Sequence, residues 1–396
     1  MNDTQREVLR AIADTVVPRI DRPDDPHGFW ARSGSEMGAH EGVAQALAQM
    51  PDLQREGLGR LALGLAEMGF LGASQRSREQ LLRNLAALGP EARAGAQALV
   101  GLSLFFAYGM PDPQTGVNAF WSEFGYPGPG APSEPQARSV APLVPDRDED
   151  AYEADAIVVG SGAGGGVIAA ALAEAGQRVI VLDAGGLFDE SEFNQYELWA
   201  YQNLYWRGGP NPTADMNVSL YAGSGYGGGT TINWTNCLRT KPWVREQWAR
   251  EHGLEGLDGP EFDRHLDAVW KRLSVNDRCS DLNGTQARMK AGADRLGWSF
   301  KTITRNIDES RYSADTAGLI GFGDRSGAKL STARTYLADA REHGAEVIVR
   351  CFAERVLVEG GRAAGVEAVY ADPESGHTAR VTVRAPRVVV ACGALE

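Results

Sequence analysis

The sequence predicts an α/β protein in which a parallel sheet is interrupted by a long insertion and preceded by a helical domain. Three observations support this fold class. Residues 156–185 have the pattern of a strand, a glycine-rich turn, a helix and a second strand. Residues 1–110 carry apolar side chains at helical spacing, and the chain from residue 345 onward has strand-like patterns. With 396 residues, the chain is long enough for two or three domains.

The first 110 residues are predicted to form the helical domain. Thr4 with Glu7, and Ser77 with Gln80, have the spacing of capping boxes ahead of amphipathic runs. Pro90 is expected to open a further helix, because proline suits the first helical turn. We find no catalytic constellation in this region and interpret it as a packed helical domain.

The rest of the chain divides by composition. Residues 111–150 are rich in Pro, Gly and acidic residues and are predicted to be a linker. Residues 151–240 would hold the first part of the sheet domain, residues 241–340 an interleaved region, and residues 341–396 the second part of the sheet. Val388–Val390 is a short apolar run, as expected of a buried parallel strand.

The turn after the first strand matches G-x-G-x-x-G at Gly160, Gly162 and Gly165. The first glycine permits a tight turn, the second lets backbone approach a pyrophosphate, and the third lets the helix pack closely on the sheet. A diphosphate would then lie at the helix N-terminus, where free N–H groups favour anions. Asp183 ends the second strand, where a carboxylate can accept hydrogen bonds from a ribose. The segment therefore predicts a Rossmann-like dinucleotide site.

Composition excludes other classes of function. The formal net charge of −13 argues against nucleic acid as a partner. The four cysteines lie at positions 237, 279, 351 and 392, without the spacing of a zinc site, so we predict no metal and free thiols. The chain opens with no export-signal pattern, and its most apolar stretch is too short for a membrane span. We therefore expect a cytoplasmic protein, with membrane association only through a partner.

A second glycine cluster occupies residues 222–239, AGSGYGGGTTINWTNCLR, with five glycines within seven residues. Such a run cannot be a regular helix or strand interior. A flexible surface loop is one interpretation, and a loop that lets backbone approach a flat ligand is the other. The neighbouring residues TTINW are partly apolar and β-forming, which favours an ordered, buried loop.

At this cluster the sequence resembles the glucose–methanol–choline (GMC) oxidoreductases, whose first signature matches Gly227 to Asn233. Ser224 and Tyr226 depart from the usual residues of that signature and indicate a divergent branch. LYWRGGPNPTADMNVSLYAGS and the helical first domain are similar to the long-chain alcohol oxidases and their bacterial dehydrogenase relatives. SGAKLSTARTYLADA resembles a stretch late in the family's first half, carried here by Ser331 and Tyr336.

The resemblance implies a three-layer FAD-binding domain with an interleaved partial substrate domain, and FAD as cofactor. It implies oxidation of an alcohol by hydride transfer to the flavin, with oxygen, a quinone or a cytochrome as the electron acceptor. The motifs and the resemblance together give the residues expected to contact the cofactor: Gly160, Ser161, Gly162, Ala163, Gly165, Asp183, Gly227, Gly228, Gly229, Thr230, Asn233 and Val356.

In the family, the histidine that takes the alcohol proton belongs to a motif downstream of a second signature, which VVVACGALE resembles in its opening residues. None of the six histidines here lies in such a motif. We therefore name no catalytic residue and expect an N-terminal portion that is inactive alone. Two alternatives remain: an NAD(P)-dependent dehydrogenase, which leaves the second glycine cluster without a role, and a non-catalytic flavin-binding or assembly module that needs a partner.

Overall fold

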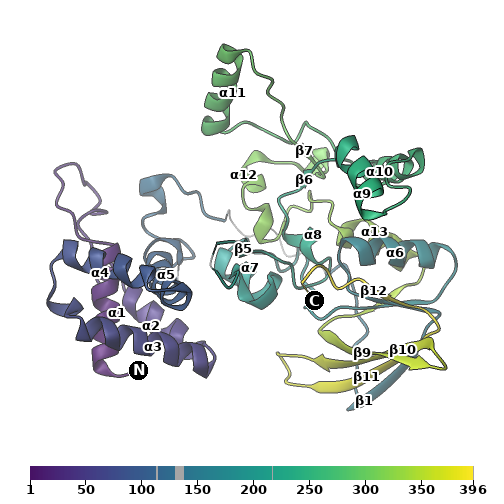
Figure 1. Ribbon diagram of the computed structural model, residues 1–396, viewed down its shortest axis with the longest axis horizontal. Coiled ribbons are helices and arrows are strands. Elements are labelled where there is room, and N and C mark those ends of the chain that lie inside the picture. Colours follow the sequence, from purple (N-terminus) through teal and green to yellow (C-terminus); the bar gives the residue numbers. More distant parts are fainter. Residues whose placement is uncertain (113–114, 130–137, 216, 396) are drawn as a thin grey trace. The chain divides into compact units, whose positions relative to one another are not determined.

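The computed structural model describes residues 1–112, 115–129, 138–215 and 217–395. The chain divides into two compact units, which we call the helical unit (Met1–Gly128 with Asn211–Leu220) and the sheet unit (Pro129–Pro210 with Tyr221–Glu396). Figure 1 shows the helices of the first unit in purple and blue and the sheets of the second in blue to yellow. Each unit has its own apolar core.

Within its described residues the helical unit contains five α-helices packed around buried apolar side chains, as predicted from the apolar periodicity. The core includes Ile12, Leu65, Phe70 and Leu99, each at most 1% exposed. The helices and short turns of the unit are α1 (Asp3–Val16), α2 (Ala39–Gln49), α3 (Asp52–Glu67), η1 (Phe70–Gly72), α4 (Gln75–Ala87), α5 (Pro90–Leu104), a π turn η2 (Phe105–Gly109) and η3 (Trp121–Phe124). The two short strands β4 (Asn211–Pro212) and β5 (Ser219–Leu220) pair antiparallel.

Both predicted capping boxes are wrong in position. The first helix begins earlier, because Asn2 and Gln5 form the reciprocal pair: Gln5 N donates to Asn2 Oδ1 at 2.9 Å and Asn2 N to Gln5 Oε1 at 2.8 Å. Likewise Ser74, three residues before Ser77, is the N-cap of α4. Thr4 and Ser77 are thus already helical. Pro90 does open α5, as predicted.

The segment 111–150 is more than a linker, although residues 113–114 and 130–137 lie outside the described residues. Its first part packs on the helices: Asn118 Nδ2 donates to Met110 O at 2.9 Å, and Trp121 Nε1 donates to Tyr108 O at 2.8 Å. Its last part enters the sheet unit, where Leu143 N donates to Val347 O at 2.8 Å. The aromatic side chain of Trp121 and some apolar residues of this segment are buried. Composition alone did not indicate this.

The sheet unit contains a parallel sheet with the strand order β12-β2-β3-β8. Its strands are β2 (Ala156–Val159), β3 (Val179–Leu182), β8 (Glu346–Ile348) and β12 (Val388–Val390). A second sheet has the order β1-β11-β10-β9, with β1 parallel to β11 and the other pairs antiparallel. Its strands are β1 (Glu149–Glu153), β9 (Cys351–Glu359), β10 (Arg362–Ala371) and β11 (Thr378–Arg384).

These elements form three layers. One face of the parallel sheet, with Val158 and Val181, packs against α6 (Ala163–Glu174) and α13 (Tyr336–Glu342). The other face, with Ile157 and Ile180, packs against the second sheet. Figure 1 shows α6 and α13 on one side of β12 and the strands β9 to β11 on the other. Because both faces of β2 and β3 are covered, every residue of these strands is apolar and buried. The predicted α/β fold with a three-layer domain is confirmed.

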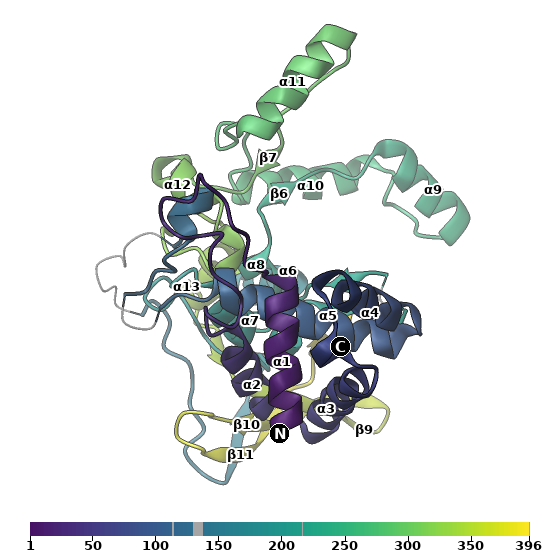
Figure 2. The ribbon, with the colours of Figure 1, turned by 90° about the vertical axis from the view of Figure 1, so that its left-hand side faces the viewer.

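The residues between β3 and β8 form the insertion, which carries α7 (Glu197–Leu204), α8 (Gly229–Ile232), β6 (Asn236–Cys237), α9 (Pro242–His252), α10 (Pro260–Arg272), α11 (Gly284–Leu296), β7 (Thr304–Arg305), η5 (Glu309–Arg311), α12 (Ala314–Ala317), η6 (Ile320–Phe322) and η7 (Thr332–Arg334), with a further short turn η4 (Trp206–Gly208). In Figure 2, α9, α10 and α11 project away from α6 and α8. Neither α10 nor α11 has a fully buried side chain. Among the helices of the described chain, none combines the length and apolarity that a bilayer span requires.

Candidate functional site: two glycine loops at the N-terminus of one helix

The first glycine loop connects β2 to α6. Glycine suits each of its three motif positions for a different local reason. Gly160 has φ +98°, a conformation that favours glycine. A Cβ at Gly165 would overlap the carbonyl oxygen of Gly160, so the helix can pack against the turn only without a side chain there. At Gly162, which is the N-cap of α6, an added Cβ would meet only the Cα of Gly228, at 3.9 Å. Gly162 therefore faces open space.

The N-terminus of α6 is suited to an anion. Gly162 offers no side-chain cap, and the first backbone bond of the helix runs from Gly166 N to Gly162 O at 2.9 Å. Ala163 and Gly164 in this first turn are exposed, and a Cβ at Gly164 would meet nothing within 4 Å. Uncapped N–H groups together with the helix dipole attract a negatively charged group such as a phosphate.

Asp183 lies at the end of β3, as predicted, but its carboxylate is already engaged by the protein. Ser161 donates to Oδ2 from its backbone N, at 2.9 Å, and from its hydroxyl, and Gly185 N donates to Oδ1 at 2.9 Å. Burial raises the pKa of Asp183, while the hydrogen bonds from Ser161 and Gly185 act in the opposite direction. The carboxylate thus fixes the first glycine loop, a role that the sequence did not indicate.

The second glycine loop, which we define as Gly223–Asn233, packs against the first part of the sheet domain. Tyr226 N donates to Gly186 O at 3.0 Å, and Gly225 pairs with Gly186 as an isolated bridge. A Cβ at Gly185 would overlap the backbone of Gly225. Gly225, Tyr226 and Gly227 are buried. The interpretation as a buried loop, and not a surface loop, therefore holds for its middle part, Gly225 to Gly227.

The two glycine loops are bonded to one another. Gly227 N donates to Ser161 Oγ at 2.9 Å, so Ser161 connects this loop to Asp183. Gly228 has φ +53°, and a Cβ there would lie 2.8 Å from Gly162 Cα. The absence of a side chain at Gly228 therefore lets the two backbones meet at the start of α6.

Thr332 completes this junction and was not among the predicted site residues. Its hydroxyl lies within hydrogen-bond distance of Ser161 O, at 3.2 Å, and Gly227 O, at 3.3 Å, and can donate its one proton to either. Its backbone N donates to Thr230 Oγ1 at 3.0 Å. Thr230 Oγ1 in turn donates to Gly227 O at 2.6 Å. The only sequence signal for Thr332 was its place inside SGAKLSTARTYLADA, the segment of this chain that resembles a stretch late in the family's first half.

The remaining predicted residues lie in different surroundings. Gly229 and Thr230 form the first turn of α8, and a Cβ at Gly229 would meet nothing within 4 Å. Asn233 is the exposed C-cap of α8 and accepts a hydrogen bond from Thr235 N at 3.1 Å. Val356 lies in β9 of the second sheet, opposite Val366, and is 37% exposed. It is therefore on a different sheet from the strand that carries the first glycine loop.

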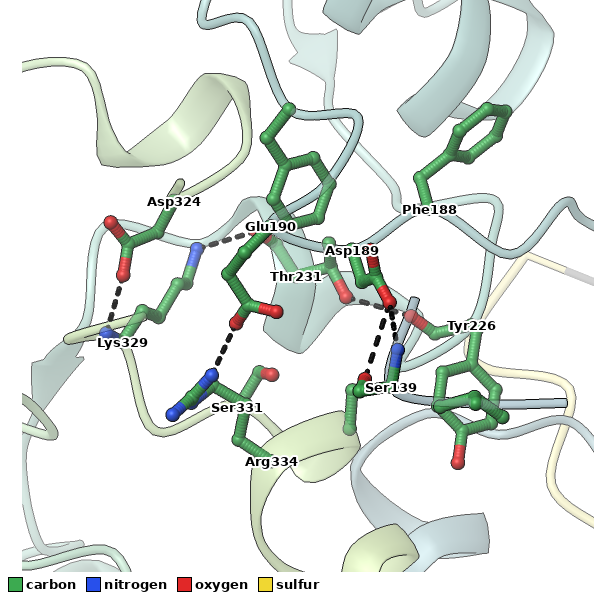
Figure 3. A pocket seen from close by; sticks show the side chains of 13 residues that line it. Ser139, Phe188, Asp189, Glu190, Tyr226, Thr231, Asp324, Lys329, Ser331 and Arg334 are labelled. Atoms are coloured by element: carbon green, nitrogen blue, oxygen red, sulfur yellow. Dashed lines mark hydrogen bonds and ion pairs between the residues drawn. The ribbon is translucent and has the colours of Figure 1, made fainter. Parts of the chain in front are cut away.

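A narrow cavity lies beside the second glycine loop, and Figure 3 shows its lining. Its charged lining includes Lys329, Asp324, Asp189, and the ion pair of Arg334 with Glu190 at 2.5 Å. Lys329 is 3% exposed. Burial lowers the pKa of Lys329 to about 7, and the nearby Asp324 opposes this shift. Sequence patterns gave no indication of this buried lysine.

The sequence is similar to those of known oxidoreductases. Residues 201–396 match the family model described as GMC oxidoreductase. The long-chain-alcohol oxidase FAO3 of Arabidopsis thaliana is 33% identical over 256 residues, which cover 63% of this chain and 34% of that protein. The uncharacterized GMC-type oxidoreductase Rv0492c of Mycobacterium tuberculosis is 33% identical over 322 residues, covering 81% of this chain and 48% of that protein.

Among solved structures, pyridoxine 4-oxidase from Mesorbium loti is similar with a TM-score of 0.44 and 19% identity, covering 61% of this chain and 50% of that one. The chain thus spans about a third of the length of the plant oxidase and about half that of the bacterial relative.

Proposed function

The chain belongs to the GMC oxidoreductase family, and from this premise we propose that it binds FAD between its two glycine loops, as the flavin-binding part of an alcohol oxidoreductase. The observation that carries the proposal is the meeting of Gly162 and Gly228 at the uncapped N-terminus of α6. Two backbones without side chains leave room for a diphosphate, and the helix supplies N–H donors to it.

The residues present fit this cofactor. Gly162, Gly164 and Gly229 each face space in which a Cβ would have no close neighbour. We assign the diphosphate to the first turn of α6, with Gly162 and Ala163, and the second glycine loop to the flavin end. Asp183 holds Ser161 in place and, with two oxygens and about four lone pairs, has acceptor capacity left for a ribose hydroxyl.

The proposed substrate class is a primary alcohol, supported by similarity to a plant long-chain-alcohol oxidase. FAD, when bound, would supply the acceptor for the hydride that leaves the carbinol carbon. The work of this chain would be to bind and orient the cofactor on two rigid loops and to exclude water from one side of it. An NAD(P) site would leave the second glycine loop without a ligand to contact.

We further propose that this 396-residue chain does not itself hold the base that takes the alcohol proton. A neutral imidazole suits that role, because its pKa is near neutrality. All six histidines lie outside the two glycine loops: His27 beside Glu123, His40 in α2, His252 in α9, His265 in α10, His343 after α13 and His377 beside Tyr370. The same observation favours a second candidate function, a flavin-binding module that works with a partner.

The test is direct identification of the cofactor. The purified chain is denatured, and the released small molecules are separated and identified by absorbance and mass. The expected result is one FAD for each chain. If the chain is isolated without cofactor, it is titrated with FAD and, separately, with NAD⁺ and NADP⁺. Binding of a nicotinamide cofactor in preference to FAD would refute the proposal.

A further inference from the structure

Lys329 reaches the second glycine loop from a segment about a hundred residues further along the chain. Its Nζ donates hydrogen bonds to Asn233 O at 2.6 Å, to Thr231 O at 2.7 Å and to Ile320 O at 3.2 Å. Figure 3 shows the side chain of Lys329 extended toward Thr231 along the edge of the cavity. The lysine therefore joins the end of α8 to the turn η6.

All three ammonium protons are used on neutral acceptors. An ammonium group has three donors and no acceptor, and here each donor meets one backbone carbonyl. The nearest carboxylate, Asp324, instead accepts from Lys329 backbone N at 2.6 Å and from Ser326 N at 3.1 Å. The lysine is therefore held as a link between backbone segments and not as one half of a direct ion pair.

The position of this link gives it a specific consequence for the loop. α8 is a single turn that begins at Gly229, inside the second glycine loop, and ends at Ile232. The carbonyls at the end of a helix have no partner within the helix, and a cation there is favourable. Lys329 supplies donors to two carbonyls at that end, Thr231 and Asn233. Without Lys329, both carbonyls would lose the ammonium donor that the structure gives them, at a cost in free energy.

We propose that Lys329 is a positioning residue that holds the second glycine loop, through the carbonyls of Thr231 and Asn233, in the conformation that receives FAD. The inference rests on the proposed function, since it assigns this loop to the cofactor. Lys329 does not need to touch the cofactor: it acts on the backbone that does. It also places a buried positive charge behind the loop, facing Asp324, Asp189, and the Glu190–Arg334 pair across the cavity.

The first test uses the FAD-free chain, so that it does not depend on cofactor binding. Hydrogen exchange is measured in peptides that cover residues 223–235, for wild type, Lys329→Met and the exposed-lysine control Lys301→Met. We expect at least a tenfold faster exchange in Lys329→Met, with α6 and the helical unit unchanged, and no change in Lys301→Met. Unchanged protection of residues 223–235 in Lys329→Met would overturn the proposal.

The second test measures the dissociation constant of FAD between pH 6 and pH 9. Burial lowers the pKa of Lys329 to about 7, so the wild-type ammonium is lost across this interval. We expect wild-type affinity to fall as the pH rises, by up to about tenfold per pH unit. The profile should be flat in Lys329→Met, with weaker affinity throughout, and flat in Lys329→Arg, which stays charged. Parallel profiles in wild type and Lys329→Arg would overturn the proposal.

Two outcomes are kept distinct by this design. A wild-type chain that binds no FAD refutes the proposed function, and the exchange comparison in the FAD-free chain then still decides whether Lys329 orders the loop. If Lys329→Met does not fold, Lys329→Gln is used instead, because its amide retains two donors on a shorter arm. It should show faster exchange in residues 223–235 with circular dichroism like that of wild type; wild-type exchange in that variant would overturn the proposal.

Discussion

Ser161 donates two hydrogen bonds to a single carboxylate oxygen of Asp183, one from its backbone N and one from its hydroxyl. The same hydroxyl oxygen accepts from Gly227 N at 2.9 Å. A carboxylate at the end of β3 thus fixes the first glycine loop, and through it the second. Because these bonds form a chain, a change at either residue is expected to affect both loops.

Asp183→Ala is expected to weaken FAD binding by about 1.5–3 kcal/mol, the range for hydrogen bonds to a charged group. Two routes can produce this loss: a missing ribose contact, or the release of Ser161 and Gly185. Ser161→Ala separates them, because it removes the link to Gly227 and leaves the carboxylate in place. Titration of the two variants with FAD is the measurement. An affinity equal to wild type in Asp183→Ala would exclude both routes.

Gly162→Val is expected to abolish cofactor retention without unfolding the chain. Gly162 has φ −66°, which valine can adopt, and its Cβ would point into open space, with Gly228 Cα as its only neighbour at 3.9 Å. The loss is therefore one of space for the ligand. The ratio of flavin absorbance to protein is measured beside thermal unfolding, with Gly57→Val in α3 as the control, since Gly57 also has no neighbour within 4 Å. Equal flavin content in both variants would contradict the assignment.

Gly165→Ala and Gly164→Ala, neighbours in α6, should behave in opposite ways in the FAD-free chain. A Cβ at Gly165 would overlap the carbonyl oxygen of Gly160, so we expect destabilisation of about 1–3 kcal/mol or more. At Gly164 the Cβ meets nothing within 4 Å, and alanine favours the helix by up to about 1 kcal/mol. Urea unfolding of both variants checks this. Similar midpoints for the two would show that α6 does not pack against the turn as described.

The free energy of unfolding should carry a pH dependence from Lys329. Burial lowers the pKa of Lys329 from 10.5 to about 7, so between these values the unfolded chain binds a proton that the folded chain does not. The contribution of this group to stability therefore rises with pH across that interval, by at most about 1.4 kcal/mol per pH unit. Urea unfolding of wild type and Lys329→Met at pH 6.5, 8 and 9.5 measures it. The stability of wild type minus that of the variant should increase along the series, and a constant difference would count against a titrating Lys329.

The contribution of Lys329 to stability thus rises with pH, whereas FAD affinity is expected to fall with pH. The two differ because folding and cofactor binding compare Lys329 in different pairs of states. Folding compares the buried Lys329 with a solvated lysine, whereas cofactor binding compares two states in which the lysine is buried. Burial disfavours the charge in the first comparison. In the second, Lys329 can donate to all three backbone carbonyls only while it is charged, because the neutral amine has one N–H donor fewer.

The 396-residue chain, saturated with FAD, is expected to show no alcohol-dependent reduction of a dye acceptor above the background of free flavin. None of its six histidines lies in a motif like the one that carries the base in the family, and none lies in the two glycine loops. A panel of primary alcohols from methanol to long-chain substrates is the assay, with heat-denatured chain as the control. Turnover abolished by a single histidine substitution would show that a base is already present.

Much of the fold could be predicted from the sequence, because it depends on local patterns. The apolar runs Ala156–Val159 and Val179–Leu182 are buried on both faces, so their composition alone marks parallel strands. Helical periodicity located the first domain. The observed N-caps lie two or three residues before the predicted ones, because several polar side chains near a helix start can serve as the cap. The apolar and aromatic residues of the segment 111–150 did not reveal which of them would be buried.

For the candidate site, the sequence by itself located the first glycine motif and Asp183. This was possible because a characteristic number of residues separates the glycine turn from the end of the next strand. Only the tertiary structure decided how these parts are joined. Ser161 and Gly227 lie 66 residues apart, Ser161 and Thr332 lie 171 apart, and Thr231 and Lys329 lie 98 apart. Each of these bonds uses a backbone group that every residue possesses, so no residue type or spacing marks it. A buried lysine and a threonine between two loops become identifiable only when the folded chain brings their acceptors within hydrogen-bond distance.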